Sequence, residues 1–384
     1  MHSNQPIQFI DLGAQQARLR AKLDLAIAQV LDGGSYIMGP QVGQFERELE
    51  QFCSARHALG CANGTDAIQL ALMALGIGPG HAVLVPSFTF AATAEVVALV
   101  GATPVFVDCR ADTFNMDVES LGQALDFASS LEVEAKAIMP VDLFGLPADY
   151  KAVQQMADQH GLDVVCDSAQ GFGGTIDGQM TGTFGKISTT SFFPAKPLGC
   201  YGDGGAVFTD DDALADIMKS LRIHGKGQHK YDNVRIGLNS RLDTLQAAIL
   251  SVKLSVYADE IAARNKVADA YGAGLTKRVA LPLVPDGYSS VWAQYTVVLP
   301  EDVNRDAVQK KLSDRGIPTA VYYGKPLHLQ PAYSQYPVAP GGLPTSEHLA
   351  ARVLSLPMHP YLSEDVQGRI IETFNAVLDE RPAS

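Results

Sequence analysis

An aspartate and a lysine, each placed at or just after a predicted strand, are the residues best suited to carry out chemistry. Asp167 ends the apolar stretch Leu162–Asp167, and Lys196 follows the stretch Ile187–Phe193 in a turn flanked by Pro and Gly. In open α/β sheets ligands bind outside the carboxyl ends of the strands, so both side chains can face one pocket. Pyridoxal phosphate needs such a pair, because a lysine forms its Schiff base and an acid keeps the pyridine nitrogen protonated. An ordinary ion pair at the sheet edge fits the spacing equally well.

A predicted helix start offers a binding place for a phosphate group. The segment Asn63–Asp66 precedes a helix that we predict over Ala67–Leu75. Backbone N–H groups at a helix N-terminus bind anions, and the Thr65 hydroxyl adds a further donor. Ser191, in the strand before the lysine, can supply a second hydroxyl. A plain turn with a Thr or Asp cap, and a strand serine bonded to a neighbouring backbone, explain the same residues without a phosphate.

Two phenylalanines follow the end of another predicted strand. Phe88 and Phe90 come directly after the apolar stretch Ala82–Pro86. One of these rings can stack on a pyridine ring, since aromatic rings favour offset stacking. A single aromatic side chain is more often part of the core, so the sequence leaves both roles open.

Six motifs, taken together and in order, resemble the DegT/DnrJ/EryC1/StrS family of nucleotide-sugar aminotransferases. They are GTDAIQLAL, PSFTFAATAE, VDLFG, DSAQGFG, SFFPAKPLGCYGDGG and GLNSRLDTLQAAIL. The resemblance extends from Phe9 to Pro360 and covers nearly the whole chain. It implies the α/β fold of the fold-type I aminotransferases, pyridoxal 5'-phosphate as cofactor, L-glutamate as amino donor, and a homodimer with active sites at the subunit interface.

The resemblance assigns roles to the residues that match the family's motifs. Lys196 would bind the cofactor and later move a proton between the cofactor carbon and the sugar carbon, and Asp167 would pair with the pyridine nitrogen. Gln170 would lie beside the ring hydroxyl. Phe90 would stack on the ring, while Phe88 would pack in the core. The remaining cofactor positions are Gly64, Thr65, Asp66, Ser191 and, from the partner subunit, Asn239.

Within the family, stretches such as IDLGAQQARL and FFPAKPLGCYGDGGA resemble the UDP-2-acetamido-2-deoxy-ribo-hexuluronate 3-aminotransferases. These enzymes aminate C3 of a 3-keto uronic acid sugar. The resemblance implies substrate contacts from Gly34, Tyr36, Arg241, Tyr322, Tyr323 and His328. That subgroup has a serine where this chain has Ala195, and a His-Tyr pair where it has two tyrosines. A phenol does not carry the positive charge of an imidazolium. His328 fits a structural role in its loop equally well.

The elements that must position these residues follow an alternating pattern. Apolar stretches such as Pro104–Asp108 alternate with helical stretches such as Ala148–His160. This order predicts an α/β fold with a mainly parallel sheet and helices on both faces. The pattern changes at a long predicted helix over 239–254, which continues toward Ala273 as a bridge. A further strand is expected at Thr319–Tyr323.

The change of pattern predicts two domains. We expect a large cofactor-binding domain over residues 1–255. A bridging helix and a smaller C-terminal α/β domain would then occupy residues 256–384.

Composition and charge exclude several classes of protein. The 384 residues include 29 Lys and Arg against 42 Asp and Glu, a net charge of −13, so the chain has no general basic surface for nucleic acid. Residues 1–6 lack a secretory signal pattern, and no apolar run approaches the roughly 20 residues of a membrane span. The five cysteines include no C-x-x-C pair and indicate reduced thiols in a cytoplasmic protein.

Several other functions remain as alternatives. Amination at C4 of a UDP- or dTDP-4-keto-6-deoxy sugar competes with amination at C3, because the outcome depends on how the sugar is rotated over the cofactor. A dehydratase of the same fold would replace Lys196 by histidine, and a non-catalytic regulatory protein would not need the full set of cofactor residues. The stretch Gly76–Gly80 follows a helix, not a strand, which argues against a dinucleotide site. We expect no metal, and a surface glycan such as lipopolysaccharide as the end product.

Overall fold

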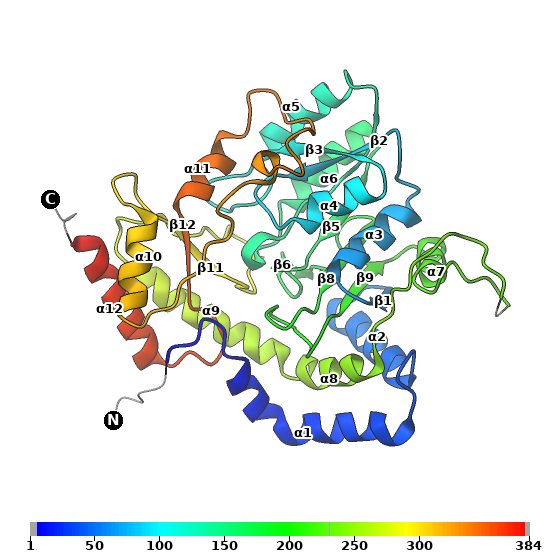
Figure 1. Cartoon of the computed structure of the whole chain (residues 1–384), viewed down its shortest axis with the longest axis horizontal. Coiled ribbons are helices and arrows are strands. Elements are labelled where there is room, and N and C mark those ends of the chain that lie inside the picture. Colours follow the sequence, from blue (N-terminus) through cyan, green and yellow to red (C-terminus); the bar gives the residue numbers. More distant parts are fainter. Residues whose placement is uncertain (1–5, 230, 381–384) are drawn as a thin grey trace.

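A computed structural model describes residues 6–229 and 231–380 and shows a seven-stranded sheet with helices on both faces (Figure 1). Four neighbouring pairs of strands are parallel, and only the strand Gly205–Thr209 runs antiparallel to both of its neighbours. The predicted α/β class with a mainly parallel sheet is therefore confirmed. In spatial order the strands are β1 (His57–Cys61), β9 (Gly205–Thr209), β8 (Ile187–Ser191), β5 (Asp163–Asp167), β4 (Glu134–Ile138), β2 (His81–Pro86) and β3 (Thr103–Val107).

The strands of this sheet are buried on both faces, which is why they read as short apolar runs. In β9, Ala206 and Phe208 pack in one hydrophobic cluster, and Val207 between them packs in another. Helices cover both faces of the sheet. They are α2 (Pro40–Cys53), α3 (Gly64–Ala74), α4 (Ala92–Leu99), α5 (Val118–Ala128), α6 (Tyr150–His160), α7 (Asp212–Leu221) and α8 (Thr244–Leu254). Helix α1 (Leu12–Gly33) packs along the outer side of α8.

The C-terminal part builds a second hydrophobic core at one end of the molecule, away from α7 (Figure 1). Its elements are α9 (Tyr257–Gly274), β11 (Tyr295–Val298), α10 (Arg305–Asp314), α11 (Pro344–Arg352), β12 (Val353–Leu356) and α12 (Glu364–Asp379). Strands β11 and β12 pair antiparallel. Three two-residue strands, β6 (Thr175–Ile176), β7 (Gln179–Met180) and β10 (Tyr288–Ser289), form a small separate sheet. Single 3-10 turns lie at Leu143–Gly145 and Leu327–Leu329.

The predicted bridge from residue 239 to Ala273 is two helices. Helix α8 ends at Leu254, and α9 begins at Tyr257. We keep the division at residue 255 as a proposal. The helical conformation is interrupted there, and residues from Val267 onward pack in the second core. The N-terminal segment also reaches that part, since Met358 N donates to Phe9 O at 3.1 Å.

The predicted strand Thr319–Tyr323 is wrong. Only Ala320 forms a bridge, to Ser355 of β12, and the rest of the segment is irregular. The chain turns at Tyr322 and Tyr323, so the segment does not continue along β12 and no longer ladder forms.

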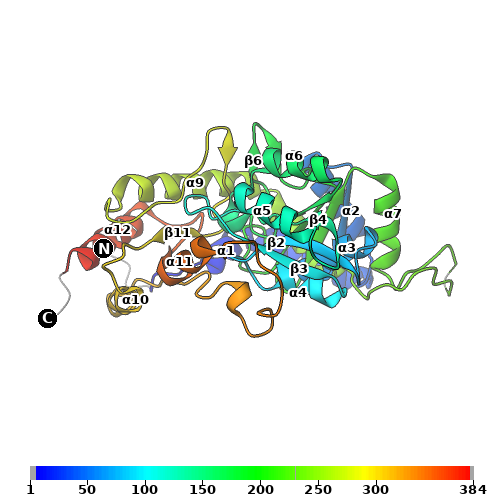
Figure 2. The same ribbon diagram turned by 90° about the horizontal axis from the view of Figure 1, so that it is seen from above.

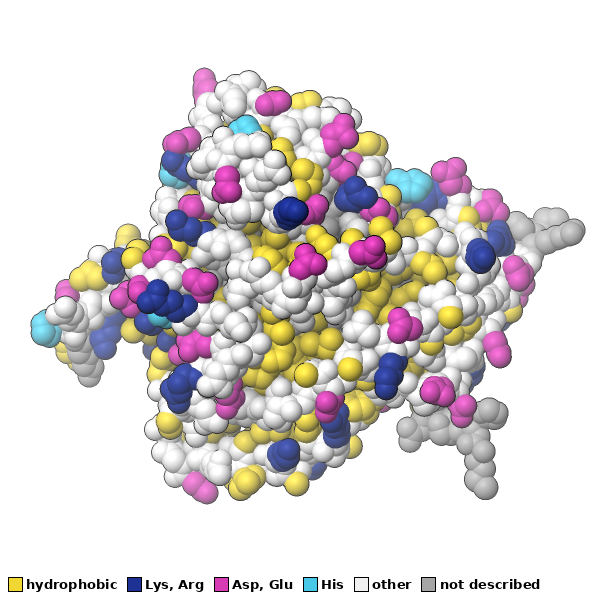
Figure 3. Space-filling view, turned by 180° about the vertical axis from the view of Figure 1, so that it is seen from behind, with side chains coloured by type: hydrophobic (Ala, Val, Ile, Leu, Met, Phe, Trp, Pro, Cys, Tyr) yellow, Lys and Arg dark blue, Asp and Glu magenta, His cyan; other side chains and the backbone are white. Residues whose placement is uncertain are grey.

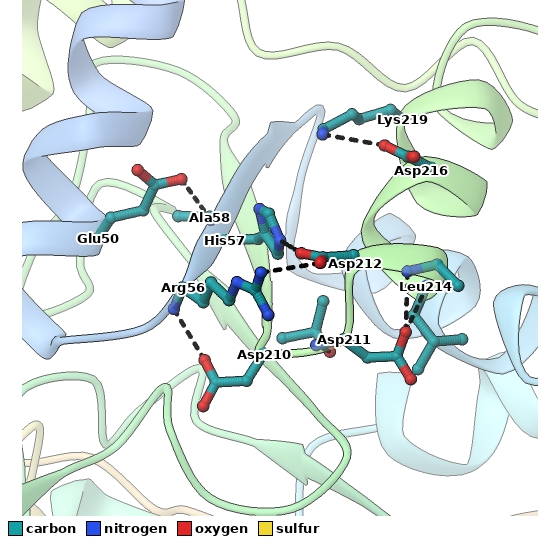
Figure 4. A network of polar contacts seen from close by, with 12 residues as sticks. Glu50, Arg56, His57, Ala58, Asp210, Asp211, Asp212, Leu214, Asp216 and Lys219 are labelled. Atoms are coloured by element: carbon teal, nitrogen blue, oxygen red, sulfur yellow. Dashed lines mark hydrogen bonds and ion pairs between the residues drawn. The ribbon is translucent and has the colours of Figure 1, made fainter.

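Polar contacts hold the edge strand β1 beside β9 and α7 (Figure 4). Arg56 N donates to Asp210 Oδ1 at 2.8 Å, and His57 Nε2 lies 2.7 Å from Asp212 Oδ1. Asp211 caps α7 by accepting from the backbone of its first turn. These contacts fix the strand that leads into the segment Asn63–Asp66.

The chain after α7 projects from the body of the molecule (Figure 2). Within it, Lys226 and Asn233 form an isolated antiparallel bridge, and Ile236 is 91% exposed. None of the helices in the described ranges 6–229 and 231–380 is long and apolar enough to cross a membrane.

Candidate active site

Asp167 lies at the carboxyl end of β5, where its carboxylate is buried and hydrogen-bonded. Thr93 Oγ1, in the first turn of α4, donates to Asp167 Oδ2 at 3.2 Å, and Ala169 N donates to Oδ1 at 3.1 Å. Burial raises the pKa of Asp167, while these donors and the positive charge of Lys196 lower it. The two donors favour the ionised form, which is the form that can accept from a protonated ring nitrogen.

Lys196 lies in the turn after β8, where Lys196 N donates to Phe193 O at 2.8 Å. Across the described residues, its Nζ has no hydrogen-bond or ion-pair partner. Burial lowers the pKa of Lys196, and the nearby charge of Asp167 opposes that shift. The structure thus brings Asp167 and Lys196 close enough for the charge of each to shift the pKa of the other. A lysine with a lowered pKa is more readily neutral, and the neutral amine is the nucleophilic form.

Gln170 is buried, and both ends of its side-chain amide are used. Its Oε1 accepts from Phe144 N at 2.9 Å, and its Nε2 donates to the Tyr323 hydroxyl at 3.1 Å. Gln170 and Tyr323 lie 153 positions apart in the sequence. This contact joins the strand-end loop to the C-terminal part of the chain.

The start of α3 forms a cradle against β8. Asn63 caps the helix by accepting from Asp66 N at 2.8 Å. The backbone N–H groups of Gly64 and Thr65 have no protein acceptor in the part of the chain that the structure describes. A Cβ added at Gly64 would lie 2.6 Å from Ser191 Cβ, so only glycine lets the helix start approach the serine this closely. Two free N–H groups and two hydroxyls here fit a phosphate group.

The two phenylalanines have different environments. Phe88 is buried, and its ring lies 6.3 Å from the rings of Phe144 and Tyr323, centroid to centroid. Phe90 is 55% exposed, and its ring lies 6.5 Å from that of Tyr323. Phe88 is thus a core residue, as expected, and Phe90 has a ring face open to a ligand.

Asn239 and Arg241 lie on the segment that leads into α8. The Arg241 guanidinium donates to Asn239 Oδ1. Ser240 between them is buried, and its Oγ accepts from Ala62 N at 3.2 Å. The segment therefore runs beside the residue that precedes the α3 cradle. A contact from the partner subunit remains a prediction.

Gly34 and Tyr36 lie beside the start of α8. Gly34 has a φ of +65° and ends α1, where its N–H donates to Val30 O at 3.0 Å. Tyr36 is half-exposed, and its carbonyl accepts from Thr244 N at 3.0 Å. Their proposed contact with a sugar nucleotide remains a prediction.

His328 and Tyr322 pack in the C-terminal loop region. The Nδ1 atom of His328 lies 2.7 Å from Ser87 Oγ, and its Nε2 lies 3.3 Å from Glu347 Oε1. Both ring nitrogens thus have protein partners, as a structural role of His328 requires. The Tyr322 ring lies 6.4 Å from that of Phe9. Substrate contacts from these residues remain predictions.

Comparison with known proteins places this site in a family. The family model described as the DegT/DnrJ/EryC1/StrS aminotransferase family matches residues 18–375. This chain belongs to that family.

Similar proteins cover nearly the whole chain. A UDP-2-acetamido-2-deoxy-3-oxo-D-glucuronate aminotransferase from Pseudomonas aeruginosa is 46% identical over 93% of this chain and 96% of its own length. A UDP-N-acetyl-3-dehydro-alpha-D-glucosamine 3-aminotransferase from Acidithiobacillus ferrooxidans is 42% identical over 98% and 100%. The crystal structure of a family aminotransferase from Brucella abortus is 54% identical, with a TM-score of 0.95 over 97% of this chain and all of that one.

This member of the DegT/DnrJ/EryC1/StrS family is thus an aminotransferase that uses pyridoxal phosphate, as the resemblance implied. The residues present fit the cofactor. Lys196 and Asp167 supply the amine and the carboxylate, and the Gly64–Ser191 contact leaves a donor-lined cradle at a helix N-terminus. A glycine that a Cβ would block, beside unpartnered N–H groups, is what close approach of a phosphate requires.

Sequence reasoning missed two residues that support this site. Thr93 bonds to Asp167, and the only signal was its place in the motif PSFTFAATAE. Asp142, in the motif VDLFG, is fully buried beside the end of β5, where its N–H donates to Asp167 O at 3.0 Å. Its Oδ1 accepts from Ala148 N at 2.9 Å and from the Tyr150 hydroxyl at 2.6 Å, and burial raises the pKa of Asp142 to about 7.

Proposed function

We propose that this aminotransferase places an amino group on C3 of a UDP-2-acetamido-3-keto-hexuronic acid, with L-glutamate as donor. The observation that supports amination at C3 of a UDP sugar is the agreement between two relatives, and the relative from P. aeruginosa, which is named for a glucuronate, supports the uronic acid. The proteins from P. aeruginosa and A. ferrooxidans are both named for UDP sugars with an oxidised C3, and both match more than nine-tenths of the chain. The product would then be a nucleotide amino sugar for a surface polysaccharide.

We assign the chemistry to two side chains. Pyridoxal phosphate, when bound, supplies an electron sink for the carbon that exchanges its amino group. Asp167, whose ionised form accepts hydrogen bonds from Thr93 and Ala169, would keep the ring nitrogen protonated. Nζ of Lys196 is free of protein partners among the described residues. It would act as the base and acid that takes a proton from one carbon and returns it to another.

The remaining cofactor residues would fix its orientation. The N–H groups of Gly64 and Thr65, with the hydroxyls of Thr65 and Ser191, would hold the phosphate. Gln170 would lie beside the ring hydroxyl, and Phe90 would cover one ring face. The Phe90 ring lies 6.5 Å from that of Tyr323, and the Tyr323 hydroxyl accepts from Gln170 Nε2. Phe90 and Gln170 thus both lie close to Tyr323.

We also propose that the enzyme is a homodimer with shared active sites. Hydrophobic side chains gather in a band across one face of the molecule (Figure 3). Ile37 and Ile236 are exposed large apolar residues, and both lie near the segments that carry Tyr36 and Asn239. Large exposed apolar surface marks an interaction site, which supports burial of this face against a second copy. The role of Asn239 in the neighbouring site is part of this proposal.

A cytoplasmic location completes the proposal. All five cysteines are free and buried. Free thiols are typical of a reducing compartment.

A two-step absorption experiment tests the substrate. L-Glutamate should remove the visible absorption band of the cofactor-loaded enzyme, and after gel filtration the 3-keto uronic acid sugar, generated in situ, should restore it. If a UDP- or dTDP-4-keto-6-deoxy sugar restores the band and the 3-keto sugar does not, the chemistry stands and the C4 alternative replaces C3. If glutamate leaves the band unchanged, the donor is wrong. The Lys196→Ala variant is the control that should show neither step.

A further inference from the structure

A lysine with no carboxylate partner is buried beneath the loop that carries Lys196. Lys253, on α8, is 1% exposed. Its Nζ donates to Gly199 O at 2.6 Å and lies 4.1 Å from the centroid of the Tyr201 ring. In the described part of the chain it forms no ion pair. Burying an ammonium group without a counter-ion is costly, so the contacts it makes must be strong ones.

These contacts belong to a clamp that α8 closes on one short segment. Gln246 lies two helical turns before Lys253 and therefore on the same face of α8. Its Oε1 accepts from Tyr201 N at 2.9 Å, and its Nε2 donates to Tyr201 O at 3.4 Å. Lys253 and Gln246 thus hold residues 199–201 from one helix.

The clamped segment closes the loop of Lys196. Cys200 N donates to Phe192 O at 2.8 Å, which ties the far end of the loop back to the end of β8. The loop is tightly folded, because a Cβ at Gly199 would lie 2.5 Å from Pro194 O. Lys196 lies in the middle of this closed loop, so a shift of residues 199–201 moves the lysine.

We propose that Lys253 is a positioning residue, a buried cation that fixes the loop and so the place of the Lys196 amine. Without the ammonium group, the buried Gly199 carbonyl would lose its donor, and leaving such a group unsatisfied weakens the local fold. Of the two α8 side chains that hold the segment, only Gln246 would then remain. The inference rests on the proposed role of Lys196, but not on the identity of the sugar.

The charges around Lys253 support this reading. Burial lowers the pKa of Lys253 to about 8, and the negative charges of Cys200, when ionised, and of Glu260 on α9 oppose the shift. Burial raises the pKa of the neighbouring Tyr201, and the positive charge of Arg20 on α1 opposes that shift. At neutral pH the amine is therefore mainly charged, and above pH 8 it becomes neutral.

Amide hydrogen exchange of the apoprotein tests the proposal without cofactor or substrate. In Lys253→Met, peptides covering residues 192–201 should exchange about tenfold faster, the effect expected from losing one hydrogen bond to a charged donor. Lys253→Arg should restore part of the protection. Lys266→Met, at an exposed lysine of α9, is the matched control and should leave these peptides unchanged. Equal exchange in wild type and Lys253→Met would overturn the proposal.

The loaded enzyme and the wild-type protein give two further readouts. Lys253→Met should lower kcat about tenfold with little change in KM for the sugar, because a misplaced lysine affects the proton transfer and not the binding. If Lys253→Met does not fold, wild-type apoprotein still decides the matter. Its protection in residues 192–201, corrected for intrinsic exchange, should fall between pH 7 and pH 9.5 relative to the strands. Constant relative protection would contradict the proposal.

Discussion

At the scale of single residues, the proposed chemistry depends on Lys196. Lys196→Ala should abolish turnover, with a loss of at least about a thousandfold, because general base and nucleophile are removed together. Its unfolding temperature should stay close to that of the wild type, since Nζ has no protein partner among the described residues. Lys186→Ala, at a surface lysine, serves as control. Retained biological activity in Lys196→Ala would favour a regulatory function over catalysis.

Asp142 makes a prediction about pH. Burial raises its pKa from 3.8 to about 7, so between pH 4 and pH 7 the folded protein keeps a proton that the unfolded chain releases. The stability of the folded state should therefore fall as pH rises through this window. Asp142→Asn removes the titrating group, so the stability of this variant should fall less as pH rises through this window.

Thermal unfolding of apoprotein from pH 4.5 to pH 7.5 measures the effect. The wild type should lose stability relative to Asp142→Asn with rising pH. His359 titrates in both proteins and cancels in the comparison, whereas the negative charge of Asp167 is one of the causes that raise the pKa of Asp142 and is present in both proteins. Parallel curves for the two proteins would show that Asp142 is ionised throughout.

Several site residues were predictable because they stand at strand ends. Asp167 ends β5, and Lys196 follows β8 by five residues, so the pattern of apolar strands was enough to place both. Contacts between distant segments were not predictable. The bond from Gln170 to Tyr323 joins residues 153 positions apart, and no local pattern encodes it.

At the scale of elements, the start of α3 carries the cofactor phosphate in this account. Gly64→Ala should weaken binding of pyridoxal phosphate at least about tenfold, because its Cβ would meet Ser191 and force the helix start away from β8. Fluorescence titration of the apoprotein measures this affinity. Gly368→Ala, in α12, is the matched control, since its Cβ would meet nothing within 4 Å. Unchanged affinity in Gly64→Ala would show that the phosphate does not bind at the start of α3.

The helices and strands were predictable where the spacing of apolar residues in the sequence matches the side chains that the fold buries. Strand β2, His81–Pro86, begins one residue before the predicted stretch Ala82–Pro86 and ends with it, because its side chains are buried on both faces. The break between α8 and α9 was missed, because Ser255 and Val256 interrupt the helix without a proline or glycine to signal it. The segment Thr319–Tyr323 has the composition of a strand but forms only one bridge to β12, since the chain turns at Tyr322 and Tyr323.

At the scale of the whole molecule, the homodimer makes a prediction of its own. If Asn239 acts in the partner's site, a hybrid of Lys196→Ala and Asn239→Ala subunits contains one site with both defects and one intact site. Mixing the two defective variants should then restore activity, up to half of the wild-type value per hybrid dimer. If Asn239 acts within its own subunit, both sites of the hybrid stay defective and no activity returns. Light scattering of each variant checks that both still form dimers.

The central claim is that this aminotransferase delivers its amino group to C3 of the sugar. The most direct measurement uses 15N-labelled L-glutamate with the 3-keto UDP-uronic acid sugar generated in situ, followed by NMR of the purified product. If the enzyme aminates C3, 15N will correlate with the sugar proton at C3. Label at C4, or product only from 4-keto sugars, would contradict it.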